Sequence, residues 1–128
     1  MADLSNCRPG NWLRYMPENQ YCTFIAKEMY VVVEMYNGRR NCFEDQLTYI
    51  RVSPDILSVC KFTMNGPLWT KQVAGKTLTV SLAGDRVYLA ADSGQSRLIS
   101  HLHSFQNAYQ DLTGERLTPN IYGIHDSH

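Results

Sequence analysis

The last third of the chain carries one strong helical pattern, which constrains the fold more than any other feature. Five apolar or aromatic residues recur at spacings of three and four within residues 96–114: Leu98, Leu102, Phe105, Tyr109 and Leu112. This spacing places them on one face of an α-helix. Gly114 follows where a left-handed C-terminal cap is expected, and Pro119 ends any helical conformation soon afterwards. A helix with such a face must lie on another surface, which the preceding segments have to supply.

Most of the sequence before this helix is typical of β-strands. Asn37-Gly38 is the strongest hairpin signal, because both residues tolerate the positive φ of a type I′ turn. Residues 76–82 alternate apolar and polar side chains, and Ala83-Gly84-Asp85 predicts a turn back into the next strand. The expected strands, rich in aromatic and β-branched residues, are 10–15, 21–26, 30–36, 40–43, 47–52, 69–73, 76–82 and 86–90.

A second, short helix is expected in the middle of the chain. Ser53-Pro54-Asp55 combines a capping serine, a proline at the first helical position and an acidic residue in the first turn. This helix should end near Cys60, and Asn65-Gly66-Pro67 should form a loop. We therefore predict an α+β fold with a mostly antiparallel sheet, for which an SH3-like or small open barrel is one possible form. The long C-terminal helix packs on that sheet. Residues 1–128 should form a single domain with a mobile tail from about residue 119.

The composition excludes some classes of function. The chain has 128 residues and a formal net charge of zero, and eight of its twelve basic residues are arginine. Because binding to a nucleic-acid backbone normally needs a basic excess, a nucleic-acid polymer is not the expected partner. The first residues contain no signal-peptide core, and no apolar run approaches the length of a membrane span. We expect a cytoplasmic protein, with no membrane partner, whose four separated cysteines remain thiols.

No catalytic or metal motif stands out. A nucleophile beside a base is not recognisable, and the scattered glycines form no phosphate-binding loop. His101 and His103 lie two positions apart on the predicted helix, so they should point in different directions and not share a metal. His125 and His128 lie in the expected tail. We therefore predict no catalytic residues, no metal ligands and no cofactor.

A group of arginines and aromatic residues is the candidate binding site. Arg39 and Arg40 follow the predicted turn at the tip of a hairpin, and Tyr36 precedes it. Aromatic rings that stack on a base, beside arginines that pair with phosphate, suit a nucleotide ligand. Alternatively, the tryptophans are core residues and the two arginines only protect a sheet edge. The candidate ligand-binding residues are Trp12, Arg14, Tyr36, Arg39, Arg40, Trp69 and Asn107.

The ends of the chain resemble a group of small proteins. Residues 101–117, HLHSFQNAYQDLTGERL, resemble the C-terminal signature of small uncharacterised proteins of Bacteroidetes genomes, their phages and mobile elements. Residues 8–13, RPGNWL, resemble the start of the same proteins. The resemblance implies a small one-domain protein carried by a phage or mobile element, without an established activity. Gln106 and Asn107 fall in the shared motif, and they either bond to sheet backbone or face a pocket.

Three functions are compatible with these observations. The first is a non-catalytic, homo-oligomeric binding module that sequesters a small anionic ligand, such as a nucleotide signal of host defence. The second is a protein-interaction module that inhibits a host protein through a strand edge or the C-terminal helix. The third is an enzyme, such as a nucleotide hydrolase. A pocket lined by arginine and aromatic residues would favour the first function, and an exposed apolar patch would favour the second.

Overall fold

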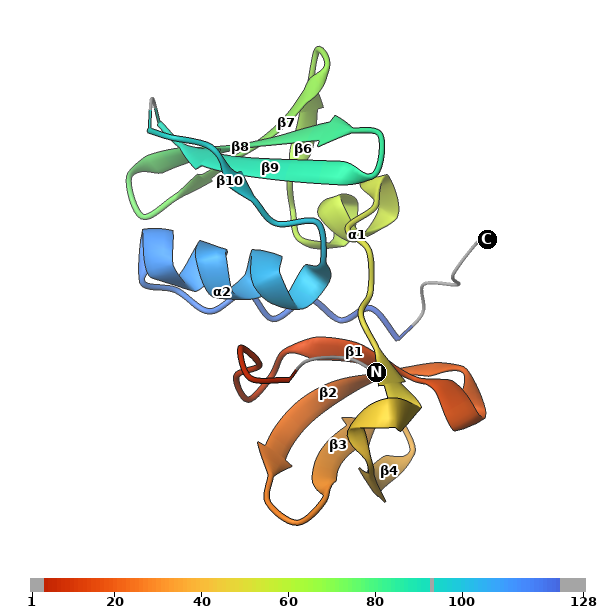
Figure 1. Cartoon of the computed structure of the whole chain (residues 1–128). Coiled ribbons are helices and arrows are strands. Elements are labelled where there is room, and N and C mark those ends of the chain that lie inside the picture. The colour runs from red at the N-terminus through yellow and green to blue at the C-terminus, as the bar shows by residue number, and fades with distance from the viewer. Residues whose placement is uncertain (1–3, 93, 123–128) are drawn as a thin grey trace.

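The computed structural model describes residues 4–92 and 94–122, which form two antiparallel sheets with a helix between them (Figure 1). The first sheet has the strand order β4-β3-β2-β1-β5 and the second β10-β9-β8-β7-β6. The strands of the first sheet are β1 (Trp12–Tyr15), β2 (Gln20–Lys27), β3 (Val31–Met35), β4 (Gly38–Cys42) and β5 (Leu47–Thr48). Those of the second are β6 (Thr63–Asn65), β7 (Leu68–Val73), β8 (Lys76–Ala83), β9 (Arg86–Ala91) and β10 (Arg97–Leu98).

Two α-helices and two 3₁₀ helices complete the described fold. Helix α1 (Pro54–Val59) follows β5 on the way to the second sheet, and helix α2 (Leu102–Thr113) lies between the sheets. The 3₁₀ helices η1 (Met16–Glu18) and η2 (Glu44–Gln46) follow β1 and β4. The predicted α+β class is confirmed. The sheets are not closed into a barrel, so the barrel form considered from the sequence is not the one adopted.

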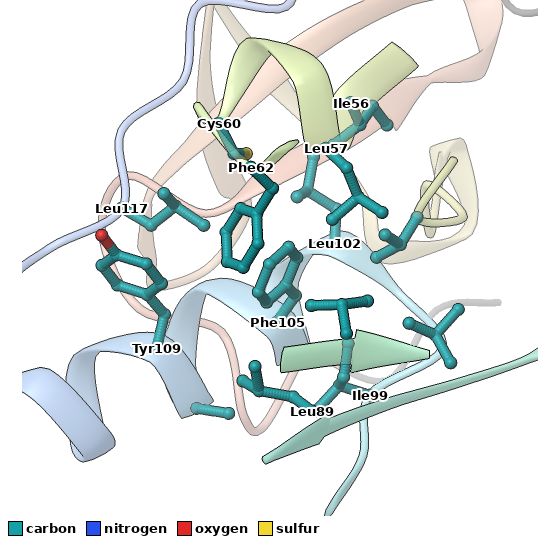
Figure 2. Close-up of a cluster of buried hydrophobic side chains, with 14 of the residues drawn as sticks. Ile56, Leu57, Cys60, Phe62, Leu89, Ile99, Leu102, Phe105, Tyr109 and Leu117 are labelled. Carbon is teal, nitrogen blue, oxygen red and sulfur yellow. The ribbon is translucent and has the colours of Figure 1, made fainter. Parts of the chain in front are cut away.

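Helix α2 supplies the centre of the larger hydrophobic core (Figure 2). Leu102 and Phe105 are fully buried, and the Phe105 ring lies 5.5 Å from that of Phe62, centroid to centroid. Leu89 of β9 packs in the same cluster from the second sheet, and Trp12 of β1 joins it from the first. A separate hydrophobic cluster is built mainly from strands of the first sheet, and its members include Leu13, Cys22, Val33 and Leu47. Of the five residues of the predicted helical face, Leu102, Phe105 and Tyr109 are therefore core, and they pack between the two sheets.

The start of the C-terminal helix differs from the prediction. The helix begins at Leu102 rather than near Ser96, and Leu98 lies in β10 with 59% of its surface exposed. The reason is backbone pairing with distant segments: Ile99 N–H donates to Val87 O at 2.7 Å, and Leu102 N–H donates to Ile50 O at 2.7 Å. These bonds satisfy backbone groups that another helical turn would have used. Leu112 is only half-buried.

The other end of the helix and the start of α1 follow the prediction. Gly114 adopts φ +76°, and its N–H bonds to Gln110 O at 2.8 Å, as a left-handed cap requires. Ser53 accepts a hydrogen bond from Ile56 N–H at 3.3 Å, and Pro54 is the first helical residue. The predicted hairpin of β8 and β9 is also present, with Val80 paired to Leu89 in the buried layer.

Two turns differ from their predicted form. The first hairpin is present, but Met35 pairs with Gly38, so Tyr36-Asn37 is the loop and only Gly38, at φ +128°, has positive φ. A type I′ turn would need positive φ at both loop residues, so that turn type is wrong. The predicted loop at Asn65-Gly66-Pro67 includes the last residue of β6, a short strand that the sequence analysis missed.

The cysteines and the C-terminal segment add two further findings. The four cysteines form no disulfide, and burial raises the pKa of the Cys22 and Cys60 thiols to about 12.

The expected tail is ordered in its first part, because Ile121 is fully buried and Tyr122 packs edge-on against Trp12. The rest of that tail, with His125 and His128, lies outside the described residues.

Candidate functional site

The predicted residues at the first hairpin do not gather at one point. Arg39 and Arg40 are consecutive in β4, so their side chains leave opposite faces of the sheet. Arg39 lies 3.7 Å from Glu34, Nε to Oε1, and is 66% exposed. Tyr36 is also 66% exposed, and its ring meets that of Tyr122 edge-on at 6.2 Å.

Arg40 is already engaged by acidic and polar groups. Its Nε lies 2.8 Å from Glu18 Oε2, and its Nη2 donates to Asn37 Oδ1 at 3.3 Å. The hydrogen bond to Glu18 raises the pKa of Arg40, with a further contribution from the Glu18 charge against an opposing one from desolvation. An anionic ligand would therefore compete with Glu18 for this guanidinium.

Three other predicted residues, Trp12, Arg14 and Trp69, do not lie at the first hairpin. They are divided between the two sheets, and both tryptophans are buried. Trp12 is 4% exposed in β1, and Trp69 is 9% exposed in β7 of the second sheet. Arg14 places its guanidinium 5.8 Å from the centroid of the Tyr21 ring. The ring of Tyr122 makes edge-on contacts with the rings of both Trp12 and Tyr36. Both tryptophans belong to the hydrophobic core, as the alternative interpretation predicted.

Gln106 and Asn107 bond helix α2 to the N-terminal segment. Gln106 is 4% exposed; its Oε1 accepts from Trp12 N–H at 2.8 Å, and its Nε2 donates to Gly10 O at 3.0 Å and Leu117 O at 2.9 Å. Asn107 Oδ1 accepts from Asn11 Nδ2 at 3.0 Å. We call Gln106, Asn107 and Asn11 the amide clasp.

Charged residues extend the amide clasp at the surface. Arg8 Nη1 lies 3.1 Å from Asp111 Oδ1 and donates to Gln110 Oε1 at 3.1 Å, and Arg116 donates to Pro9 O. The cavity left among these residues measures about 20 Å³, which is room for one water molecule. The two sequence motifs at the ends of the chain therefore meet, and their hydrogen bonds and the ion pair of Arg8 with Asp111 hold the two ends together.

A larger groove opens beside the loop that connects β2 and β3 of the first sheet. It has a volume of about 380 Å³ and lies between the loop of residues 28–30 and the segment that follows β4. Its lining residues are Lys27, Met29, Tyr30, Val31, Phe43, Glu44 and Asp45. We call this the β4-end groove.

The β4-end groove combines exposed apolar side chains with charges of both signs. Met29 is 92% exposed, Phe43 65% and Tyr30 45%. Lys27 forms an ion pair with Glu44, so the exposed Asp45 carries an excess negative charge. The sequence analysis missed this site. Its available signal was an apolar residue in each of two turn segments, Met29 and Phe43, where polar residues are more usual.

The histidines of the C-terminal motif lie together rather than apart. His101 is the extended N-cap residue of α2 and not part of the helix, so the prediction that His101 and His103 point in different directions is wrong. Their rings are nearly parallel at 6.1 Å, and Tyr49 lies 4.7 and 4.5 Å from the two rings. In the described part of the chain, no group of three or more His, Cys, Asp or Glu side chains is arranged to hold a metal ion.

Burial makes His103 a poor base. It is 4% exposed, and its Nδ1 has no hydrogen-bond partner among the described residues. Desolvation, together with a smaller contribution from the charge of the neighbouring His101, lowers the pKa of His103 to about 4. Desolvation and Arg51 also lower the pKa of His101. Both rings are therefore neutral near pH 7.

Comparison with known proteins returned no match: no family model, no curated protein and no solved structure is detectably similar to this chain. The resemblance to phage and mobile-element proteins therefore stays a prediction. Neither α1 nor α2, the α-helices of the described residues, has the length and apolar character needed to span a membrane.

We predict that replacing Gln106 destabilises the protein through the amide clasp. Gln106→Leu leaves Trp12 N–H and Leu117 O buried without partners, and the partly buried Gly10 O loses its bond to the side chain. Each unsatisfied group costs about 1–3 kcal/mol, so urea denaturation should show a loss of at least about 2 kcal/mol. Gln95→Leu, at an exposed position, is the control and should change stability by less than about 0.5 kcal/mol. Equal effects of the two substitutions would show that the clasp is not structural.

We also predict that His103 makes the protein acid-sensitive. Its pKa is about 4 in the folded state and 6.5 in the reference state, so between these values only the unfolded chain binds the proton. Stability should therefore fall by roughly 2–3 kcal/mol between pH 7 and pH 4.5 because of this group. Urea titrations at both pH values should show a smaller loss for His103→Phe than for the wild type. An identical loss in both proteins would contradict the assignment.

Proposed function

We propose that this chain is a non-catalytic protein-interaction module and that the β4-end groove is its binding surface. The observation that carries the proposal is the grouping of Met29, Tyr30 and Phe43, all exposed, around one hollow. Exposed apolar residues that gather at a concave site favour an interaction surface. Methionine and aromatic side chains are also those that protein interfaces use more than the rest of a surface does.

The chemistry of the groove suits a polypeptide better than a phosphorylated ligand. Its cation, Lys27, is neutralised by Glu44, while Asp45 would repel a phosphate. The polar side chains where the chain ends meet, which could otherwise line a small-molecule pocket, are hydrogen-bonded to one another and to the backbone in the amide clasp. A partner segment with an apolar side chain beside a basic one fits the groove by both shape and charge.

Peptide selection tests this function directly. A random peptide library displayed on phage is selected against the wild type and against Phe43→Ser, which removes one wall of the groove. We expect enriched peptides with an apolar residue next to Lys or Arg, and at least tenfold weaker binding to Phe43→Ser. Leu98→Ser is the matched control, because Leu98 is similarly exposed, at 59%, but lies in the second sheet. No enrichment, or peptides that bind Phe43→Ser as well as the wild type, would reject the proposal.

A second candidate is the binding of a small anionic, nucleotide-type ligand at the first hairpin. It is favoured by the exposure of Tyr36 and Arg39, each at 66%, on adjoining parts of this hairpin. A stacking ring and a guanidinium are the groups that such a ligand would use. In a phage or mobile-element protein this activity would sequester a host signal, with a homo-oligomer enclosing the ligand.

Calorimetry with a panel of linear and cyclic nucleotides tests the second candidate. A charge-assisted contact to phosphate contributes about 1.5–3 kcal/mol, so Arg39→Ala combined with Arg40→Ala should weaken binding at least tenfold. Thermal stability should be nearly unchanged, because the pair of Arg40 with Glu18 lies at the surface. Arg97→Ala, exposed in β10, is the control. If the wild type binds none of these nucleotides, the second candidate is excluded.

A further inference from the structure

Strand β4 is an edge strand that ends next to the β4-end groove. It is the longest edge strand of the two described sheets, with five residues, whereas β5, β6 and β10 contain two, three and two. Phe43, which lines the groove, directly follows its last residue, Cys42. The outer backbone groups of an edge strand can pair with another chain. A polypeptide that occupies the groove is therefore within reach of this edge.

The register of the first hairpin shows which backbone groups of β4 point outward. Met35 pairs with Gly38 across the loop, and the register continues without a bulge along the whole of β4. The pair that closes such a hairpin exchanges hydrogen bonds, and bonded and non-bonded pairs alternate from there. Every second residue from Gly38 onward therefore bonds to β3, whereas the backbone N–H and C=O of Arg39 and Asn41 point away from it.

Side chains close this edge at both ends and leave its middle open. The Arg40 guanidinium donates to Arg39 O at 3.0 Å. Just beyond the strand, Gln46 Oε1 accepts from Phe43 N–H at 2.9 Å, and Phe43 O accepts from Gln46 N–H at 3.0 Å. Within the described chain, no hydrogen bond occupies Arg39 N–H, Asn41 N–H or Asn41 O. These backbone groups lie next to one another and are two donors and an acceptor.

We propose that the partner of the β4-end groove binds as an added β-strand, an extended polypeptide segment whose backbone pairs with Arg39 and Asn41. This inference rests on the proposed function, because it names the conformation in which the same partner binds. The turn that Gln46 closes prevents pairing beyond Asn41, so the segment leaves the strand where the groove begins. Main-chain hydrogen bonds then contribute affinity for any extended segment, while the groove selects its side chains.

The alternation of side chains along β4 places an apolar residue of the partner in the groove. Cys42 is buried in the core of the first sheet, so its neighbours Asn41 and Phe43 point to the opposite face. Phe43 is still extended, at φ −106° and ψ 160°. A partner residue that pairs with Asn41 lies on this same face, and the next partner residue on that face reaches the exposed ring of Phe43.

The charges along the edge define the chemistry of the partner. Arg39 meets Glu34 only at 3.7 Å between side chains that are both more than half exposed, a contact of little energy. At the groove, Lys27 neutralises Glu44, whereas Asp45 is exposed. The segment should therefore have an acidic residue near Arg39, Lys or Arg near Asp45, and an apolar residue between them. A segment of uniform charge would meet a like charge at one end.

Proline at position 41 tests the added strand. The probe is the peptide most enriched in the selection on the wild type, and its binding is measured by calorimetry. Asn41→Pro removes the outward N–H and none of the bonds to β3, so the sheet should be retained. Affinity should fall about tenfold or more, because a backbone bond is lost and the proline ring obstructs the added strand. Asn41→Ala is the matched control: it removes the same side chain, keeps the N–H and should bind like the wild type.

Amide hydrogen exchange in the wild type gives a second measurement that needs no variant. Saturation with the same peptide should slow exchange of Arg39 N–H and Asn41 N–H about tenfold or more, because both become hydrogen-bonded. Arg40 N–H and Cys42 N–H bond to β3 and should be protected with and without peptide. Circular dichroism checks that Asn41→Pro is folded, and the exchange measurement decides if it is not.

The outcomes separate this inference from the proposed function. A peptide that binds through Phe43 but leaves Asn41 N–H unprotected, or that binds Asn41→Pro as tightly as the wild type, overturns the added strand and leaves the interaction module standing. A selection that enriches no peptide overturns both.

Discussion

The side-chain amide of Gln106 is the interaction on which the arrangement of this protein depends. It is buried on the helix between the sheets and bonds to the strand entry at Gly10 and Trp12 and to the segment at Leu117. A leucine here would fill similar space but take away the hydrogen-bond partner of three backbone groups, two of which are buried, and a buried group without a partner is costly. The glutamine therefore specifies one position of α2 relative to the first sheet, which apolar contacts with their weak directionality could not specify alone.

The two sheets use the helix differently. The second sheet and the α1 region pack on the apolar face of α2 through Leu89, Phe62 and their neighbours, so this contact is made by buried surface. The first sheet has its own core and meets α2 through Trp12 and the amide clasp. A helix with an apolar face toward one sheet and a hydrogen-bonding face toward the other explains why the motif of residues 101–117 contains both kinds of residue.

This division explains where binding is best sought. The polar residues near the chain ends are occupied by bonds that hold the fold. Of the histidines beside Tyr49, His103 is buried and His101 half-buried, and burial lowers the pKa of both. A surface whose side chains do not take part in the core lies at the edge of the first sheet. There Met29 and Phe43 are exposed beside the edge strand β4. Because Lys27 is paired with Glu44 and Asp45 is exposed, this surface is poorly suited to phosphate.

The sequence by itself determined the features that depend on neighbouring residues. The caps at Ser53 and Gly114 and the hairpin of β8 and β9 were predictable, because turn chemistry and spacing act within a few residues. Only the tertiary structure decided that Leu98 is exposed in a strand, that Arg40 pairs with Glu18 and that Gln106 bonds to Trp12. In each of these cases the partner lies ten or more residues away in the chain, and a helical or turn pattern contains no information about groups that only folding brings into contact.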